Sequence, residues 1–141
     1  MKRILLPVDG TTTCGKAIKY ARDLAENFES EVIIFNSQEV IPTFVWLNDP
    51  VIVNNTEYDP ERIAKEIVEE TSKCFENSDV KLKLITRIGD PAHTILEIAD
   101  EENCDLIIMS THGMKAVKRF LLGSVTNKIV HHAEIPVLVV R

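Results

Sequence analysis

Short unbroken apolar runs recur along the chain, each bounded by polar or turn residues. They cover residues 4–8, 32–35, 106–109 and 137–140. Runs of this length without polar alternation are typical of strands that are covered on both faces, as in parallel sheets. A fifth run, Val80–Leu84, instead alternates apolar residues with two lysines. This alternation predicts a half-exposed strand at an edge of the sheet.

Between the runs, apolar residues at steps of three and four predict helices, because that spacing places them on one helical face. The three stripes are Cys14, Ala17, Ile18, Ala21, Leu24, Ala25 and Phe28; Ile63, Ala64, Ile67, Val68, Thr71, Cys74 and Phe75; and Ala92, Ile95, Leu96 and Ala99. Asp90 can cap the third helix, and Pro91 suits its first position. A last helix is expected to open at residues 123–126.

This alternation of strands and helices predicts an α/β fold, a three-layer sandwich around a five-stranded parallel sheet with right-handed crossovers. The length of 141 residues suits a single domain spanning residues 1–141. One irregular stretch, Gln38–Asp59, is long for a compact domain. It has two interpretations, a loop folded back on the sheet or a lid or partner surface.

Composition narrows the partners and the compartment. Sixteen Lys and Arg against 22 Asp and Glu give a net charge of −6, which disfavours nucleic acid and anionic membranes as partners. No stretch approaches the ~18 apolar residues of a membrane span, and Asp9 cuts short the apolar run at the start. We therefore expect a cytoplasmic protein. Cys14, Cys74 and Cys104 are widely spaced and are expected to be reduced core thiols.

The first predicted turn resembles two phosphate motifs without satisfying either. Residues 10–17 nearly fit a phosphate-binding loop, but Ala17 stands where a Ser or Thr must hold magnesium. Residues 7–11 are similar to an aspartyl phosphatase motif, but Pro7 replaces the nucleophilic Asp. Neither chemistry is expected here.

Ligands of open α/β sheets bind beyond the carboxyl ends of the strands, so the residues after each run are candidates. After the fourth run come Gly113, nine further residues and then Gly123-Ser124-Val125-Thr126. Glycine lets backbone approach a ligand closely, and a helix start presents unpaired N–H groups at a positive dipole end. This predicts a cradle for phosphates. The alternative is that Gly123 only eases a turn and Ser124 only caps the helix.

These residues make the chain similar to the universal stress protein family, over essentially its whole length. The matching segments are residues 2–10, 89–92, 105–113, 122–126 and 135–141. The resemblance implies the strand order 3-2-1-4-5 of an adenine nucleotide alpha hydrolase-like sheet. Members of this family fall into two subgroups, one that binds ATP and one that does not.

The ATP-binding members resemble one another in the pattern Gly-x2-Gly-x9-Gly-Ser/Thr. Here Ser110 replaces the first glycine, while Gly113, Gly123 and Ser124 keep the spacing. The hydroxymethyl group of Ser110 either crowds the ligand or donates a hydrogen bond to it. The resemblance implies ATP as the ligand, together with Mg²⁺ or Mn²⁺.

The resemblance also assigns residues to parts of the nucleotide. Asp9 and the backbone around Val8 and Ser37 would surround adenine, with Pro7 shaping the wall; Met109, Ser110 and Gly113 would flank the ribose; and Gly123, Ser124, Val125 and Thr126 would hold the phosphates. Asp9 has an alternative as a helix start cap, and Met109 as a core residue. Lys115, Lys118 and Arg119 either screen the phosphates or form a solvated face, and His112 is expected to bond to backbone.

No general base with an orienting partner, no nucleophile and no carboxylate pair can be picked out, so binding is favoured over turnover. The expected function is a nucleotide-dependent switch or signalling module of the stress response, acting on an unknown protein partner. The alternatives are a nucleotide-free homodimeric interaction protein and a slow ATPase. Val137–Val140 is an apolar edge that invites strand pairing, and the family often dimerises through it, so we expect a homodimer.

Overall fold

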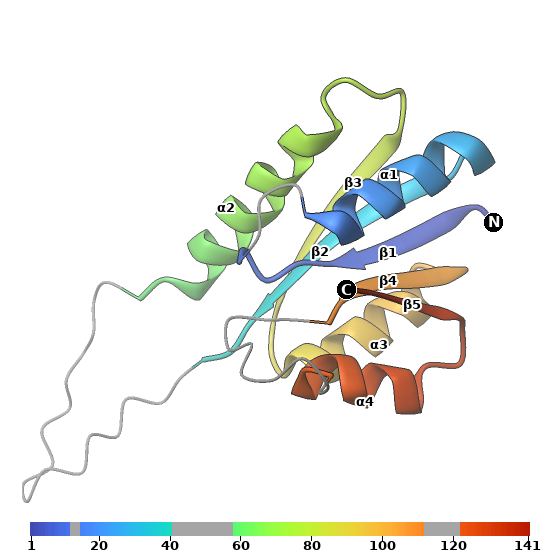
Figure 1. The fold of residues 1–141 in the computed structure, drawn as a ribbon. Coiled ribbons are helices and arrows are strands. Elements are labelled where there is room, and N and C mark those ends of the chain that lie inside the picture. Colours follow the sequence, from blue (N-terminus) through green and yellow to red (C-terminus); the bar gives the residue numbers. More distant parts are fainter. Residues whose placement is uncertain (12–14, 41–57, 112–121) are drawn as a thin grey trace, which may run out of the picture.

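The computed structural model describes residues 1–11, 15–40, 58–111 and 122–141, and within them a sheet of five parallel strands carries four helices (Figure 1). The elements in chain order are β1 (Arg3–Pro7), α1 (Lys16–Phe28), β2 (Glu31–Gln38), α2 (Pro60–Ser72), the 3-10 turn η1 (Lys73–Phe75), β3 (Lys81–Ile88), α3 (Pro91–Glu101), β4 (Leu106–Ser110), α4 (Ser124–His132) and β5 (Val137–Val140). The strand order is β3-β2-β1-β4-β5, which confirms the expected sheet and its order 3-2-1-4-5.

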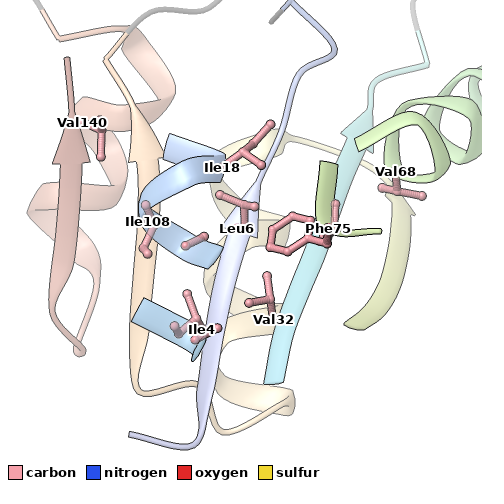
Figure 2. Close-up of a cluster of buried hydrophobic side chains, with 11 residues drawn as sticks. Ile4, Leu6, Ile18, Val32, Val68, Phe75, Ile108 and Val140 are labelled. Atoms are coloured by element: carbon pink, nitrogen blue, oxygen red, sulfur yellow. The ribbon is translucent and has the colours of Figure 1, made fainter. Parts of the chain in front are cut away.

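Alternate residues of the inner strands divide the core into two layers. Ile4, Leu6 and Val32 pack with Ile18 of α1 and Val68 of α2, and Figure 2 shows this layer with Phe75 beside Leu6. The residues between them point to the opposite face. There Leu5 and Ile33 pack with Ile95 and Ile98 of α3 and Ile129 of α4. Because both faces are covered, residues 4–7 of β1 and 32–35 of β2 are apolar throughout, as the sequence pattern predicted.

The second strand is longer than its apolar run. It continues through Asn36, Ser37 and Gln38, which pair with Thr86, Arg87 and Ile88 of β3. The apolar run at residues 32–35 therefore predicted too short a strand. Backbone pairing in a parallel ladder does not depend on apolar side chains, so hydrophobicity marked only the part of the strand that lies in the core.

The cysteines differ from one another. Cys104 is a buried free thiol, and burial raises its pKa to about 11, so it is protonated at neutral pH. Cys74 is disulfide-bonded, and the expectation of a reduced thiol is wrong for this residue. Cys14 lies outside the described residues.

No helix within the described ranges is long and apolar enough to cross a bilayer.

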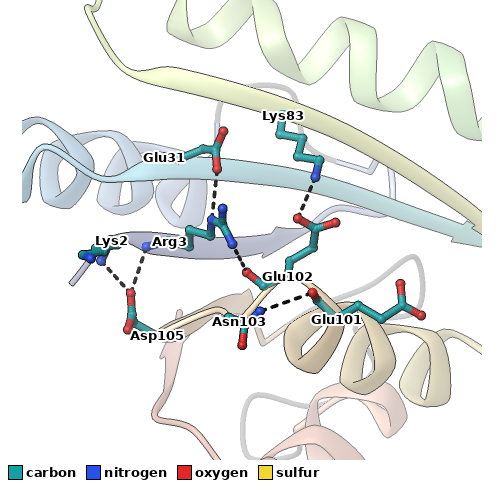
Figure 3. Close-up of polar contacts among 8 residues, drawn as sticks. All are labelled: Lys2, Arg3, Glu31, Lys83, Glu101, Glu102, Asn103 and Asp105. Atoms are coloured by element: carbon teal, nitrogen blue, oxygen red, sulfur yellow. Dashed lines mark hydrogen bonds and ion pairs between the residues drawn. The ribbon is translucent and has the colours of Figure 1, made fainter.

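Polar contacts tie together the amino ends of the central strands (Figure 3). The Asp105 carboxylate accepts the backbone N–H groups of Lys2 at 2.5 Å and Arg3 at 2.9 Å. The Arg3 guanidinium donates to the Glu102 carbonyl at 2.6 Å and pairs with the Glu31 carboxylate at 3.3 Å. These contacts fix the start of β1 between β2 and the turn that leads into β4.

The two N–H groups of Arg3 and Lys2 hold the pKa of Asp105 below its ordinary value of 3.8. A lowered folded-state pKa stabilises the fold above the unfolded pKa, and this contribution is lost as the pH falls through the folded value. We expect Asp105→Asn to lower the free energy of unfolding near pH 7 by less than about 1 kcal/mol, since the carboxylate is exposed. The difference from wild type, measured by urea denaturation, should shrink as the pH falls below the ordinary carboxyl pKa. Asp79→Asn, at an exposed acid with no ion pair in the described chain, serves as the control. A pH-independent difference would contradict this account.

Candidate functional site

The strand order places a topological switch point between β1 and β4. From β1 the chain proceeds outward to β2 and β3, and from β4 it proceeds in the opposite direction to β5. In doubly wound sheets this reversal leaves a crevice beyond the carboxyl ends of the two strands, where ligands bind. The side chains that follow β1 and β4 therefore define the candidate site.

The ladder between β1 and β4 stops before either strand ends. Only Ile4 with Leu106 and Leu5 with Ile107 are in register, although β1 continues to Pro7 and β4 to Ser110. The whole of β1, by contrast, pairs with β2.

Pro7 gives a physical reason for this early stop. The Arg3 carbonyl accepts the N–H of Asp105, and the Val8 N–H donates to Phe35 of β2, so alternate residues of β1 bond to opposite neighbours. Pro7 shares the orientation of Arg3, toward β4. Because proline has no N–H, Pro7 cannot extend the ladder on that side.

The turn after β1 is held by a buried amide. Asn36, only 2% exposed, donates from Nδ2 to the Val8 carbonyl at 2.6 Å and accepts at Oδ1 from Gln38 at 2.9 Å. The Val8 N–H donates to Phe35 at 2.8 Å. Both backbone polar groups of Val8 are thus fixed by β2.

Asp9 is exposed and closes a local turn. Its Oδ1 accepts both the N–H and the hydroxyl of Thr11, at 3.0 and 2.6 Å. The N-cap of α1 is Gly15, and no side chain caps that helix. The alternative interpretation of Asp9 as a helix start cap is therefore wrong. Within the described chain its second oxygen, Oδ2, has no hydrogen-bond partner.

The side chains of Ser37 and Met109 are engaged within the protein. The Ser37 hydroxyl donates to the Gly89 carbonyl at 2.9 Å. Met109 is 6% exposed and packs in the core beside Phe35 and Ile129. The structure thus supports the core alternative for the Met109 side chain, and its backbone is what it can offer a ligand.

The start of α4 is fixed beside the end of β4. Gly123 is the N-cap, its N–H donates to the Thr111 carbonyl at 3.2 Å, and its own carbonyl accepts from Asn127. The buried Thr126 hydroxyl donates to the Ser110 carbonyl at 3.1 Å. The exit of β4 and the first turn of α4 are therefore joined by two hydrogen bonds.

The first turn of α4 has neither a side-chain cap nor an acidic residue to offset the positive end of the helix dipole. Ser124 is its first residue and does not cap it, so that alternative is wrong. The N–H groups of Ser124, Val125 and Thr126 have no partner in the described chain, and the turn carries no acidic side chain. Unpaired N–H groups at the positive end of a helix dipole attract anions. The Val125 side chain packs against the core.

Two of the described helices begin with a side-chain cap and two do not. Asp59 and Asp90 cap α2 and α3 by accepting the N–H groups of Arg62 and His93. The helices α1 and α4 begin at glycines without a side-chain cap. These two helices follow β1 and β4, the strands that flank the switch point.

Several expected residues fall outside the described residues. They are Gly113, His112, Lys115, Lys118, Arg119 and the part of Gln38–Asp59 between residues 41 and 57. The structure gives a part in the site to Asn36 and Thr111, polar residues that come directly after the second and fourth apolar runs or one residue later. A polar residue at the end of an apolar run was the signal available for Asn36.

The described residues contain no group of three or more His, Cys, Asp or Glu side chains placed to hold a metal ion.

The fold and the exits of β1 and β4 define a doubly wound α/β protein with an anion-attracting switch point. The whole chain, residues 1–141, matches the model of the universal stress protein family. Among similar proteins, universal stress protein MJ0531 of Methanocaldococcus jannaschii is 33% identical over 140 residues, covering 99% of this chain and 82% of that protein.

The solved structure of MJ0577, from the same organism, has a TM-score of 0.80 and 32% identity, covering 99% of this chain and 94% of that one. A universal stress protein from Archaeoglobus fulgidus, solved in complex with dAMP, shares the fold with a TM-score of 0.71 at 18% identity, over 100% and 98% of the two chains. The chain belongs to the universal stress protein family.

Two glycines of the site differ in how much room they leave for an added side chain. Gly10 has a φ of 77°, and a Cβ there would lie 3.0 Å from Cδ1 and Cγ1 of Ile67 on α2. Among the described residues, a Cβ at Gly123 would meet nothing nearer than the Thr111 carbonyl, at 3.5 Å.

We expect Gly10→Ala to lower the free energy of unfolding by about 1–2 kcal/mol, through left-handed backbone strain and crowding against α2. The matched variant Gly123→Ala should change it by less than about 0.5 kcal/mol. Urea denaturation of both variants measures the difference. Equal losses would refute this reading of the two turns.

Proposed function

We propose that this protein binds ATP beyond the carboxyl ends of β1 and β4 and acts as a nucleotide-dependent switch or signalling module. The observation that carries the proposal is the uncapped first turn of α4, held by hydrogen bonds beside the end of β4. An uncapped helix start in this position suits a phosphate chain. In this arrangement Gly123, Ser124, Val125 and Thr126 hold the phosphates.

The adenine end of the proposed site is the turn after β1. Pro7 forms the wall, and Asp9 Oδ2, which has no hydrogen-bond partner among the described residues, can accept an amino-group hydrogen. Val8 and Ser37 contribute backbone. Met109, Ser110 and Gly113 flank the ribose in this proposal, Met109 through its backbone. A family member solved with dAMP supports an adenine nucleotide as the ligand class.

A divalent ion would arrive with the nucleotide. Because the described side chains form no metal-binding cluster, we propose that Mg²⁺ or Mn²⁺ takes its ligands mainly from phosphate oxygens. The ion neutralises phosphate charge, and the helix start completes that neutralisation.

Binding rather than turnover is the proposed activity, carried out in the cytoplasm. The site groups described above include no nucleophile paired with an oriented base. Any switching requires that the nucleotide favour one conformation over another. The alternatives remain a slow ATPase and a nucleotide-free interaction protein of the same family.

Gly123→Val tests the phosphate end. The added side chain should occupy the approach to the free N–H groups and weaken ATP binding at least about tenfold, while the space around Gly123 leaves folding intact. Titration calorimetry with ATP and Mg²⁺ gives the affinity, and urea denaturation confirms the fold. Gly123→Ala, a smaller addition at the same place, should weaken binding less.

Unchanged affinity in Gly123→Val would reject this placement of the phosphates. If wild type gives no heat at millimolar ATP, and mass spectrometry of the freshly purified protein finds no adenine nucleotide, the nucleotide-free alternative is favoured.

We also propose a homodimer formed through the free edge of β5. Exposed apolar side chains lie on α1 and α4, the helices that contact β5 from the two faces of the sheet. Tyr20 and Phe28 of α1 are 51% and 55% exposed and lie on the opposite side of the helix from Arg22, which bonds to the Cys74 carbonyl near α2. Val130 of α4 is 44% exposed. Antiparallel pairing of two β5 strands would bury all three against a second copy.

Phe28→Glu combined with Val130→Glu should convert the dimer to monomer at micromolar concentration, because charge would enter both flanks of the interface. Light scattering after gel filtration measures the mass. Leu84→Glu combined with Ile88→Glu places the same charge on the opposite edge, where the two residues are 41% and 39% exposed, and should leave the dimer intact. A wild-type monomer, or equal effects at both edges, would overturn the proposal.

A further inference from the structure

A groove of about 350 Å³ lies between α3 and the segment that joins α4 to β5. Its volume is within the range of small-ligand sites. It is lined by Leu96, Glu97, Ala99, Asp100, Ile107, His132, Ala133, Glu134 and Ile135. The proposed nucleotide site faces the first turn of α4, whereas the groove lies at the last turn, so one helix separates the two.

The groove combines an apolar base with acidic surroundings. Ile107 and Ala99 are buried, and Leu96 and Ile135 are half-buried. The carboxyl-bearing residues Glu97, Asp100 and Glu134 are all exposed. An occupant therefore needs an apolar portion for the base and a charge for the surrounding acids.

The charge balance of the groove favours a cation. Asp100 and Glu134 have no ion-pair partner in the described chain, and Glu97 pairs only with His93, at 3.1 Å, when that histidine is protonated. The end of α4 at His132 adds the negative pole of a helix dipole. His132 is the one lining residue that can carry positive charge.

We propose that this groove docks a partner protein through a segment that places an arginine or lysine side chain beside an aliphatic one. The aliphatic side chain covers the half-buried Leu96 and Ile135, and the cation lies between Asp100 and Glu134. Arginine suits the position because its planar fork can donate to two carboxylates. This docking does not require bound nucleotide, so it stands or falls separately from the proposed function.

The experiment titrates N-acetyl-leucyl-arginine amide, as the probe, into the isotope-labelled protein without nucleotide. Backbone amide shifts are followed by NMR during titration. Shifts concentrated in residues 96–100 and 132–135, with binding at least about fivefold weaker for the neutral citrulline analogue and weakened by salt, would support the proposal. Shifts elsewhere, no shifts, or equal binding of the citrulline analogue would overturn it.

Variants test the role of the two unpaired acids. Asp100→Asn with Glu134→Gln should weaken the probe at least about fivefold, whereas Asp79→Asn with Glu26→Gln removes the same charge elsewhere and should not. N-acetyl-glycyl-arginine amide carries the same charge as the probe and lacks only the leucine side chain. If it shifts the same amides and binds as tightly as the probe, the leucine contributes nothing and the proposal fails.

Discussion

The early end of the β1–β4 ladder is the constraint on which the candidate site depends. Two register pairs join these strands at their amino halves, and the side of Pro7 that faces β4 has no N–H to continue the pairing. The polar contacts of Asp105 and Arg3 hold the same strands together at their amino ends. Because β1 and β4 are joined at their amino ends and unpaired at their carboxyl ends, they can present backbone groups to a ligand without disrupting the core.

The helix caps follow the same division. A side-chain cap gives a helix start an internal partner, as Asp59 and Asp90 do for α2 and α3. A glycine without a cap leaves N–H groups for an external acceptor, and this is the state of the helices after β1 and β4. Side-chain caps thus stabilise the helices away from the switch point, whereas the two helices beside it begin without a side-chain cap on their N–H groups.

The helix α4 joins regions of opposite electrostatic character. Its first turn carries no acid and has N–H groups without a partner among the described residues, while the groove at its last turn is bordered by three carboxylates. The helix dipole reinforces both, since its positive end faces the proposed phosphates and its negative end faces the groove. An anion and a cation can therefore be accommodated at the two ends of one nine-residue helix.

The sequence by itself determined the parallel sheet, its helices and the segments that meet at the switch point, because burial on both faces imposes apolar runs and helical burial imposes a 3.6-residue period. It could not decide the partners of particular polar groups. Whether Asp9 caps α1 or closes its own turn, where Ser37 directs its hydroxyl, and that Asn36 holds Val8 depend on atoms brought together from different strands. The groove between α3 and β5 likewise exists only after packing, since its walls are about 35 residues apart in the chain and no local pattern links them.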